Sequence, residues 1–64
     1  MKNLLKSWTL YESDLTGHLS IIGYIYNDEQ NRFENGEPIR TSSIQYLDLK
    51  NKTAKTLNTL YNLE

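Results

Sequence analysis

The stretch HLSIIGYIYN, residues 18–27, decides the fold class, because its residues alternate between two faces with the period of a β-strand. One face carries Leu19, Ile21, Gly23 and Ile25, and the other carries Ser20, Ile22, Tyr24 and Tyr26. A glycine in the middle of a strand commonly marks a bulge or a sharp bend of the sheet. We therefore predict a bent strand over this stretch and an all-β fold around it.

Two later segments are also predicted as strands. Residues 39–49 are interpreted as one long strand with a bulge near residues 42–43, because the apolar positions change phase there. Residues 53–63 are interpreted as the last strand, although they also show helical periodicity, because their Thr and Asn residues are poor helix formers. This strand would place Leu57, Tyr61 and Leu63 on one face. Residues 50–52 are predicted as the hairpin turn between the two segments, because Asn51 tolerates the left-handed conformation.

The N-terminal segment allows two interpretations. Residues 7–13 place Trp8 and Leu10 on one face and are rich in β-favouring residues, which indicates a strand. The apolar residues of the same region also recur at helical spacing, so an N-terminal helix is the alternative. With a turn ending at Gly17, the chain is predicted to form a small antiparallel four-stranded meander or an SH3-like partly closed barrel. Residues 1–64 are expected to form a single domain.

Composition restricts the class of protein further. The 64 residues include no Cys, which excludes disulfides and thiolate metal sites. So short a chain has little core, which favours self-association, and a homodimer is left open. The net charge of −1 does not indicate bulk nucleic-acid binding. No apolar run approaches the roughly 18 residues of a membrane span, and the N-terminus lacks the apolar region of a signal peptide, so a cytoplasmic protein is expected.

Catalysis has little support in the sequence. His18 is the only histidine, and no acid, Ser or Cys lies at a recognisable spacing from it. The carboxylates gather in the loop of residues 28–37, where Asp28 and its neighbours are expected to be hydrated, and they lack the spacing of a calcium loop. We therefore predict no enzyme, no catalytic residue, no cofactor and no metal.

Aromatic residues provide the candidate binding surface. Tyr24 and Tyr26 share one strand face and could stack nucleic-acid bases or contact a protein. Phe33 stands alone in the polar loop, either as an anchor for a partner or as a plug packed on its own domain. The predicted partner-binding residues are Phe33, Glu34 and Asn35 of the acidic loop 28–37, which would form the contact, with Arg40, Tyr24 and Tyr26 as a supporting surface.

A pattern across about forty residues resembles short, mostly uncharacterised proteins of phages and prophages. It comprises Gly23-x-Ile25-Tyr26, then Phe33-x-Asn35-Gly36-x-x-Ile39-x-Thr41-Ser42-x-Ile44, then Thr56-x-Asn58-Thr59-x-Tyr61. The resemblance implies a compact β-domain encoded on a mobile element, a class that includes inhibitors of bacterial immunity such as anti-CRISPR proteins. It assigns no role to any single residue.

Three hypotheses of function follow. The first is a small non-catalytic binding protein, a phage-type inhibitor that occludes a host defence complex through protein–protein contact. The second is a small nucleic-acid-binding β-barrel that uses the tyrosines together with the lysines near the last hairpin. The third is a self-associating structural or assembly subunit.

Overall fold

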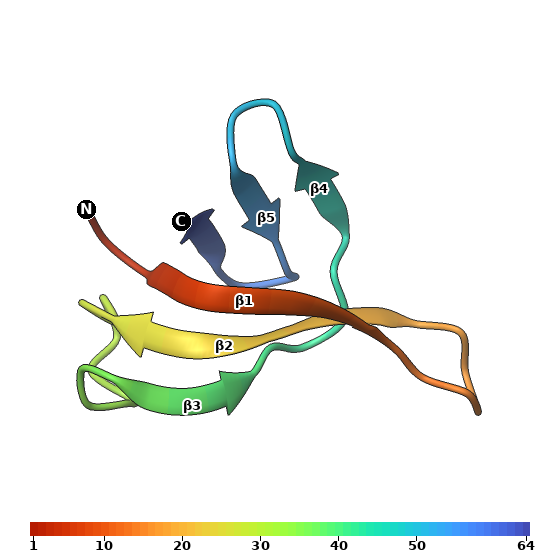
Figure 1. Ribbon diagram of the computed structural model, residues 1–64, viewed down its shortest axis with the longest axis horizontal. Helices are drawn as coiled ribbons and strands as arrows, with labels where there is room; N and C mark the ends of the chain where they lie inside the picture. The colour runs from red at the N-terminus through yellow and green to blue at the C-terminus, as the bar shows by residue number, and fades with distance from the viewer.

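The computed structural model describes residues 1–64 and contains six strands and no helix (Figure 1). The strands are β1 (Leu4–Glu12), β2 (Leu19–Tyr26), β3 (Glu37–Arg40), β4 (Tyr46–Asp48), β5 (Thr53–Lys55) and β6 (Leu60–Leu63). The all-β prediction is confirmed. The N-terminal helix is wrong, because Leu5 is paired with Ile25 of β2 on one side and with Leu63 of β6 on the other.

All six strands belong to one sheet with the order β3-β2-β1-β6-β5-β4. Every neighbouring pair is antiparallel except β1 and β6, which run parallel through Leu4 and Leu5. The β4–β5 hairpin rises away from the layer formed by β1, β2 and β3 (Figure 1). The sheet is therefore mixed and is not closed. It has six strands where four were predicted, and the predicted meander or SH3-like barrel is not confirmed.

The bend expected at Gly23 takes the form of a bulge in the neighbouring strand. Ser7 and Trp8 of β1 together lie opposite Gly23, and the register of β1 against β2 shifts there by one residue. Ser7 has a positive φ of 51°. A Cβ on Gly23 would lie 3.1 Å from the Cβ of Trp8 and 3.2 Å from the carbonyl oxygen of Lys6, so the glycine leaves room for the bulged chain.

The segment 39–49 is not one strand. After β3, the backbone N–H of Thr41 donates to Ile21 and that of Ile44 donates to Leu19, so the chain continues along β2 in irregular conformation. The N–H of Gln45 then donates to Lys55, where pairing with β5 begins. The change of phase near residues 42–43 thus marks the passage from one edge strand of the sheet to the other rather than a bulge.

The segment 53–63 is also divided. The N–H of Thr56 donates to the carbonyl of Thr59 at 2.9 Å, which closes a turn between β5 and β6. Leu57 lies in this turn and is 76% exposed, so its predicted place beside the buried Tyr61 and Leu63 is wrong. In the β4–β5 turn it is Lys52, not Asn51, that has positive φ.

The core lies between β1–β3 and β5–β6. Its seven buried apolar residues are Leu5, Ile21, Ile25, Ile39, Ala54, Tyr61 and Leu63, and Trp8, Phe33, Ile44 and Leu47 pack against them. On β2 the buried and exposed residues alternate as the sequence predicts, with Ile21 and Ile25 fully buried and Tyr24 exposed. No helix of the length and apolarity needed to cross a membrane is present.

Candidate binding surface

The outward side of β1, β2 and β3 gathers aromatic and cationic side chains. Strand pairing places Tyr24 beside Lys6 and Pro38, and Ile22 beside Thr9 and Arg40. We call this surface the tyrosine face and define it by Lys6, Tyr11, Ile22, Tyr24, Tyr26 and Arg40. Tyr24 is 46% exposed, Tyr11 41% and Ile22 38%, so three large side chains on this side of the sheet reach solvent together.

Two cations lie over tyrosine rings of this face. The ammonium of Lys6 is 4.9 Å from the ring centroid of Tyr26, and the guanidinium of Arg40 is 5.5 Å from that of Tyr11. Both distances are within the range of attractive cation–π contact. No Asp or Glu occupies an outward position among these residues, although Glu64 lies 3.8 Å from the Lys6 ammonium at the margin. The tyrosine face is therefore apolar at its centre and positive at Arg40, while the charge of Lys6 is partly compensated by Glu64.

Lys6 could not be assigned to this face from the sequence. Strict alternation along residues 7–13 puts Lys6 on the side of Trp8 and Leu10, away from Tyr11. The bulge at Ser7 inserts one residue, and that reverses the side on which every earlier residue lies. Lys6, Thr9 and Tyr11 consequently point the same way.

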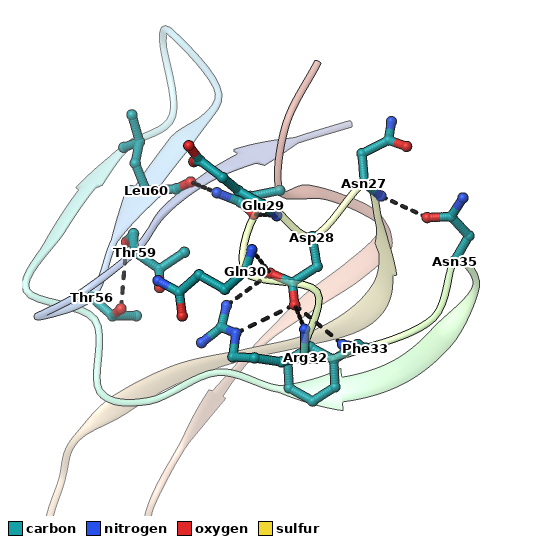
Figure 2. Close-up of polar contacts among 11 residues, drawn as sticks. Asn27, Asp28, Glu29, Gln30, Arg32, Phe33, Asn35, Thr56, Thr59 and Leu60 are labelled. Carbon is teal, nitrogen blue, oxygen red and sulfur yellow. Dashed lines mark hydrogen bonds and ion pairs between the residues drawn. The ribbon is translucent and has the colours of Figure 1, made fainter.

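The loop between β2 and β3 is organised by a buried carboxylate. The Asp28 side chain is only 1% exposed and accepts hydrogen bonds from the backbone N–H of Arg32 at 2.6 Å and of Phe33 at 3.2 Å. It also accepts from Nε and Nη2 of Arg32, at 3.3 and 3.1 Å (Figure 2). The expectation of a hydrated Asp28 is wrong. Its carboxylate oxygens accept hydrogen bonds from N–H groups of the loop that have no backbone carbonyl as acceptor.

The charge state of this pair follows from the same contacts. Hydrogen bonds from the Arg32 side chain hold the pKa of Asp28 below its ordinary value of 3.8, against the opposing effect of burial. The Asp28 carboxylate in turn raises the pKa of Arg32, and the hydroxyl of Tyr61 adds to that effect. Both groups are thus charged in the folded protein at neutral pH, and their charges compensate each other.

The six predicted partner-binding residues fall into two groups. Tyr24, Tyr26 and Arg40 lie together on the tyrosine face. Phe33, Glu34 and Asn35 lie in the β2–β3 loop, where Glu34 and Asn35 are exposed. The Phe33 ring is half-buried against the core, with the Arg32 guanidinium 5.3 Å from its centroid. Of the two roles expected for Phe33, its contacts correspond to that of a plug.

Asn35 has a structural contact of its own. Its Oδ1 accepts the backbone N–H of Asn27 at 2.7 Å (Figure 2). A second asparagine, Asn3, joins the loop to the last strand, because its Oδ1 accepts the N–H of Glu29 and its Nδ2 donates to the carbonyl of Leu60. The sequence analysis did not single out Asn3, and only its residue type, which tolerates the observed φ of 50°, could have suggested a special backbone position.

Groups able to perform chemistry are few. His18 Nδ1 and Ser43 Oγ lie 3.2 Å apart on the surface, a contact between residues distant in sequence. His18 has no carboxylate partner to orient it. No group of three or more His, Asp or Glu side chains is placed to hold a metal ion.

The chain matches no family model, no curated protein and no solved structure. A function is therefore inferred from the surfaces described above.

Proposed function

We propose that the protein is a non-catalytic binding protein that acts in the cytoplasm as a phage-type inhibitor, covering a surface of a bacterial defence complex. The single observation that carries a binding role is the tyrosine face, an exposed apolar centre flanked by Lys6 and Arg40. Tyr and Arg are the residue types that contribute most to binding energy at protein interfaces. The class of partner is supported by the resemblance to short phage and prophage proteins.

The chemistry of the face indicates what its partner carries. An apolar patch would cover Tyr24 and Ile22, and carboxylates on either side would meet Lys6 and Arg40. The cations are already placed over tyrosine rings, so little side-chain freedom is lost when the partner binds. A protein surface with acidic residues around an apolar centre fits these requirements.

Binding through this face is tested by comparing two exposed tyrosines. The chain is used to capture proteins from a lysate of bacteria carrying a defence system, and the captured partner is identified and its affinity measured. Tyr24→Ala is expected to weaken binding about thirtyfold, as for an interface anchor worth about 2 kcal/mol. Tyr46→Ala, at a residue 64% exposed on β4, is the matched control and should leave affinity unchanged.

Capture of a partner outside the defence system would contradict the proposed class of partner. Equal affinity of the Tyr24→Ala variant and the original chain would contradict binding through the tyrosine face. A direct measurement of inhibition uses bacteria that are protected from phage by the identified complex. Expression of the original chain should remove that protection, and expression of the Tyr24→Ala chain should not. Self-association through the face would instead appear as a concentration-dependent mass that the Tyr24→Ala substitution abolishes.

Single-stranded nucleic acid is the second candidate occupant, because tyrosines and cations share one face. Two observations favour a protein instead. The cations already cover the rings of Tyr26 and Tyr11, on which bases would stack, and the net charge of the chain is −1. Binding of an oligonucleotide at low salt that falls steeply as salt is added would reverse this preference.

A further inference from the structure

A polar hollow of about 270 Å³ lies where the outer end of the β1–β2 hairpin meets the segment that follows β3. We call it the hydroxyl pocket. The residues that matter to its chemistry are Ser13, Thr16, His18, Arg40, Ser42 and Ser43. They come from the turn between β1 and β2, the residue just before β2, the end of β3 and the segment after it, so only the folded chain brings them together.

The pocket is lined by no acidic residue, although the chain contains eight. Arg40 forms no ion pair with any carboxylate, and its guanidinium is held in place by the ring of Tyr11, which also lines the pocket. A second hollow, of about 340 Å³, differs in this respect, because its Lys2 is paired with Glu29 at 3.3 Å. The hydroxyl pocket therefore keeps an uncompensated positive charge.

Hydroxyl groups of the pocket retain hydrogens that they can donate. The oxygen of Ser13 accepts the N–H of Thr16, and the oxygen of Thr16 accepts the N–H of His18. A hydroxyl that accepts a hydrogen bond within the protein still has its hydrogen to donate to a ligand. The side chain of Ser42 has no hydrogen-bond partner, and His18 uses only Nδ1, toward Ser43. Several hydrogen-bond donors and one guanidinium thus surround a hollow that is lined by no carboxylate.

We infer that the hydroxyl pocket binds a phosphate group, carried by free phosphate or by a small phosphate monoester. Arg40 supplies a planar fork that pairs with two phosphate oxygens, and the hydroxyls of Ser13, Thr16 and Ser42 supply further donors. The hydrogen-bonded pair of His18 and Ser43 supplies one more, either Nε2–H or O–H according to the tautomer of the ring. The volume admits a phosphate with a small attached group. This inference goes beyond the proposed function, since its ligand is a small anion. Arg40 belongs to both sites, whereas His18 and Ser43 lie outside the tyrosine face.

The test is a titration of the ¹⁵N-labelled chain, followed by amide chemical shifts. Three probes are compared: inorganic phosphate, glycerol 3-phosphate and glycerol. We expect saturable shifts at residues 13–20 and 40–43 with both phosphates and none with glycerol. The tighter of the two phosphates identifies the source of the group. Arg40→Gln should weaken binding at least about tenfold, the effect of losing a charge-assisted bidentate contact.

Further variants separate a built site from general attraction to positive charge. Ser43→Ala and His18→Gln should each weaken binding about threefold, the loss of one hydrogen bond. Lys52→Gln, which removes the same charge as Arg40→Gln from the β4–β5 turn, should leave affinity unchanged. Shifts that do not saturate, or equal losses in Arg40→Gln and Lys52→Gln, would overturn the inference. The spectrum of each variant without ligand shows whether it is folded.

Discussion

Arg32 and Arg40 carry the same group in two contrasting regions. In the β2–β3 loop, the Arg32 guanidinium donates twice to the buried carboxylate of Asp28. At the end of β3, the Arg40 guanidinium meets no carboxylate and lies over the ring of Tyr11 beside the hydroxyl pocket. The first arginine completes an internal network, and the second forms no ion pair within the chain.

The difference shows that charge in a sequence does not by itself indicate a binding site. The β2–β3 loop is rich in charged residues, but its Asp28 and Arg32 are used to hold the loop together. The surface around Arg40 is poorer in charged residues, and the Arg40 guanidinium forms no ion pair there. A mutation in the loop should therefore affect stability, whereas a mutation near Arg40 should affect binding.

The largest effect on stability is expected from Asp28→Ala. The substitution leaves the N–H groups of Arg32 and Phe33 and the Arg32 guanidinium without their acceptor, so we expect a loss of about 3 kcal/mol. Urea unfolding of both proteins measures it. Asp48→Ala is the control, because that carboxylate accepts from Asn51 and the neighbouring backbone in an exposed turn, where its loss should matter less. Equal stability of the original chain and Asp28→Ala would show that the loop does not depend on its carboxylate.

The acid limb of the stability profile provides an independent check of the Asp28 contacts. The pKa of Asp28 is lowered on folding from 3.8, so the ionised carboxylate stabilises the fold above about pH 4. That stabilisation is lost as the pH falls through the lowered folded value. The free energy of unfolding of the original chain should thus decrease over this acid range, and Asp28→Ala should show a shallower decrease. An equal decrease of the free energy of unfolding with falling pH in both proteins would contradict the lowered pKa of Asp28.

Phe33→Ala is expected to rank second, with a loss of about 2 kcal/mol, since the ring is half-buried against the core. For a domain of this size the melting temperature should fall by about 8–16 °C. Affinity per folded molecule for the partner should be unchanged, because Phe33 lies in the loop rather than on the tyrosine face. A large loss of affinity with unchanged melting temperature would identify Phe33 as the partner anchor instead.

The smallest effects come from a charge-matched pair of substitutions. Arg32→Gln should lower the free energy of unfolding by about 1 kcal/mol, a modest figure because the Arg32 side chain is 36% exposed. Arg40→Gln removes the same charge but no ion pair, so the change should stay within about 0.5 kcal/mol. Thermal unfolding of the two variants side by side measures the difference. Equal losses would show that both arginines serve the fold.

Much of the central strand could be predicted from residue order. The alternation along residues 18–27 places Ile21 and Ile25 inside and Tyr24 outside, as the structure has them. Of the predicted binding residues, Tyr24, Tyr26 and Arg40 share one face because they occupy outward positions on paired strands. The local period of a strand determines such a face before any tertiary contact is made.

Other features depended on contacts between segments far apart in the chain. The breaks within residues 39–49 and 53–63 carry weak turn signals, and they form because β4, β5 and β6 pair with one another and with β1. Asp28 is buried because the loop folds its own N–H groups around the carboxylate, which a count of charges cannot reveal. Ser13 and Ser43 line the same hydroxyl pocket, although their positions in the sequence give no sign that they lie close together.

By itself the sequence determined an all-β protein, because alternation with period two is a local property of the residues in each strand. Tertiary structure decided the order of the strands, the parallel contact of β1 with β6 and the bulge opposite Gly23. That bulge moved Lys6 to the side of Tyr24, since one inserted residue reverses the side on which the preceding residues lie. Which strand packs beside which depends on the burial of the whole core, and no short segment carries that information.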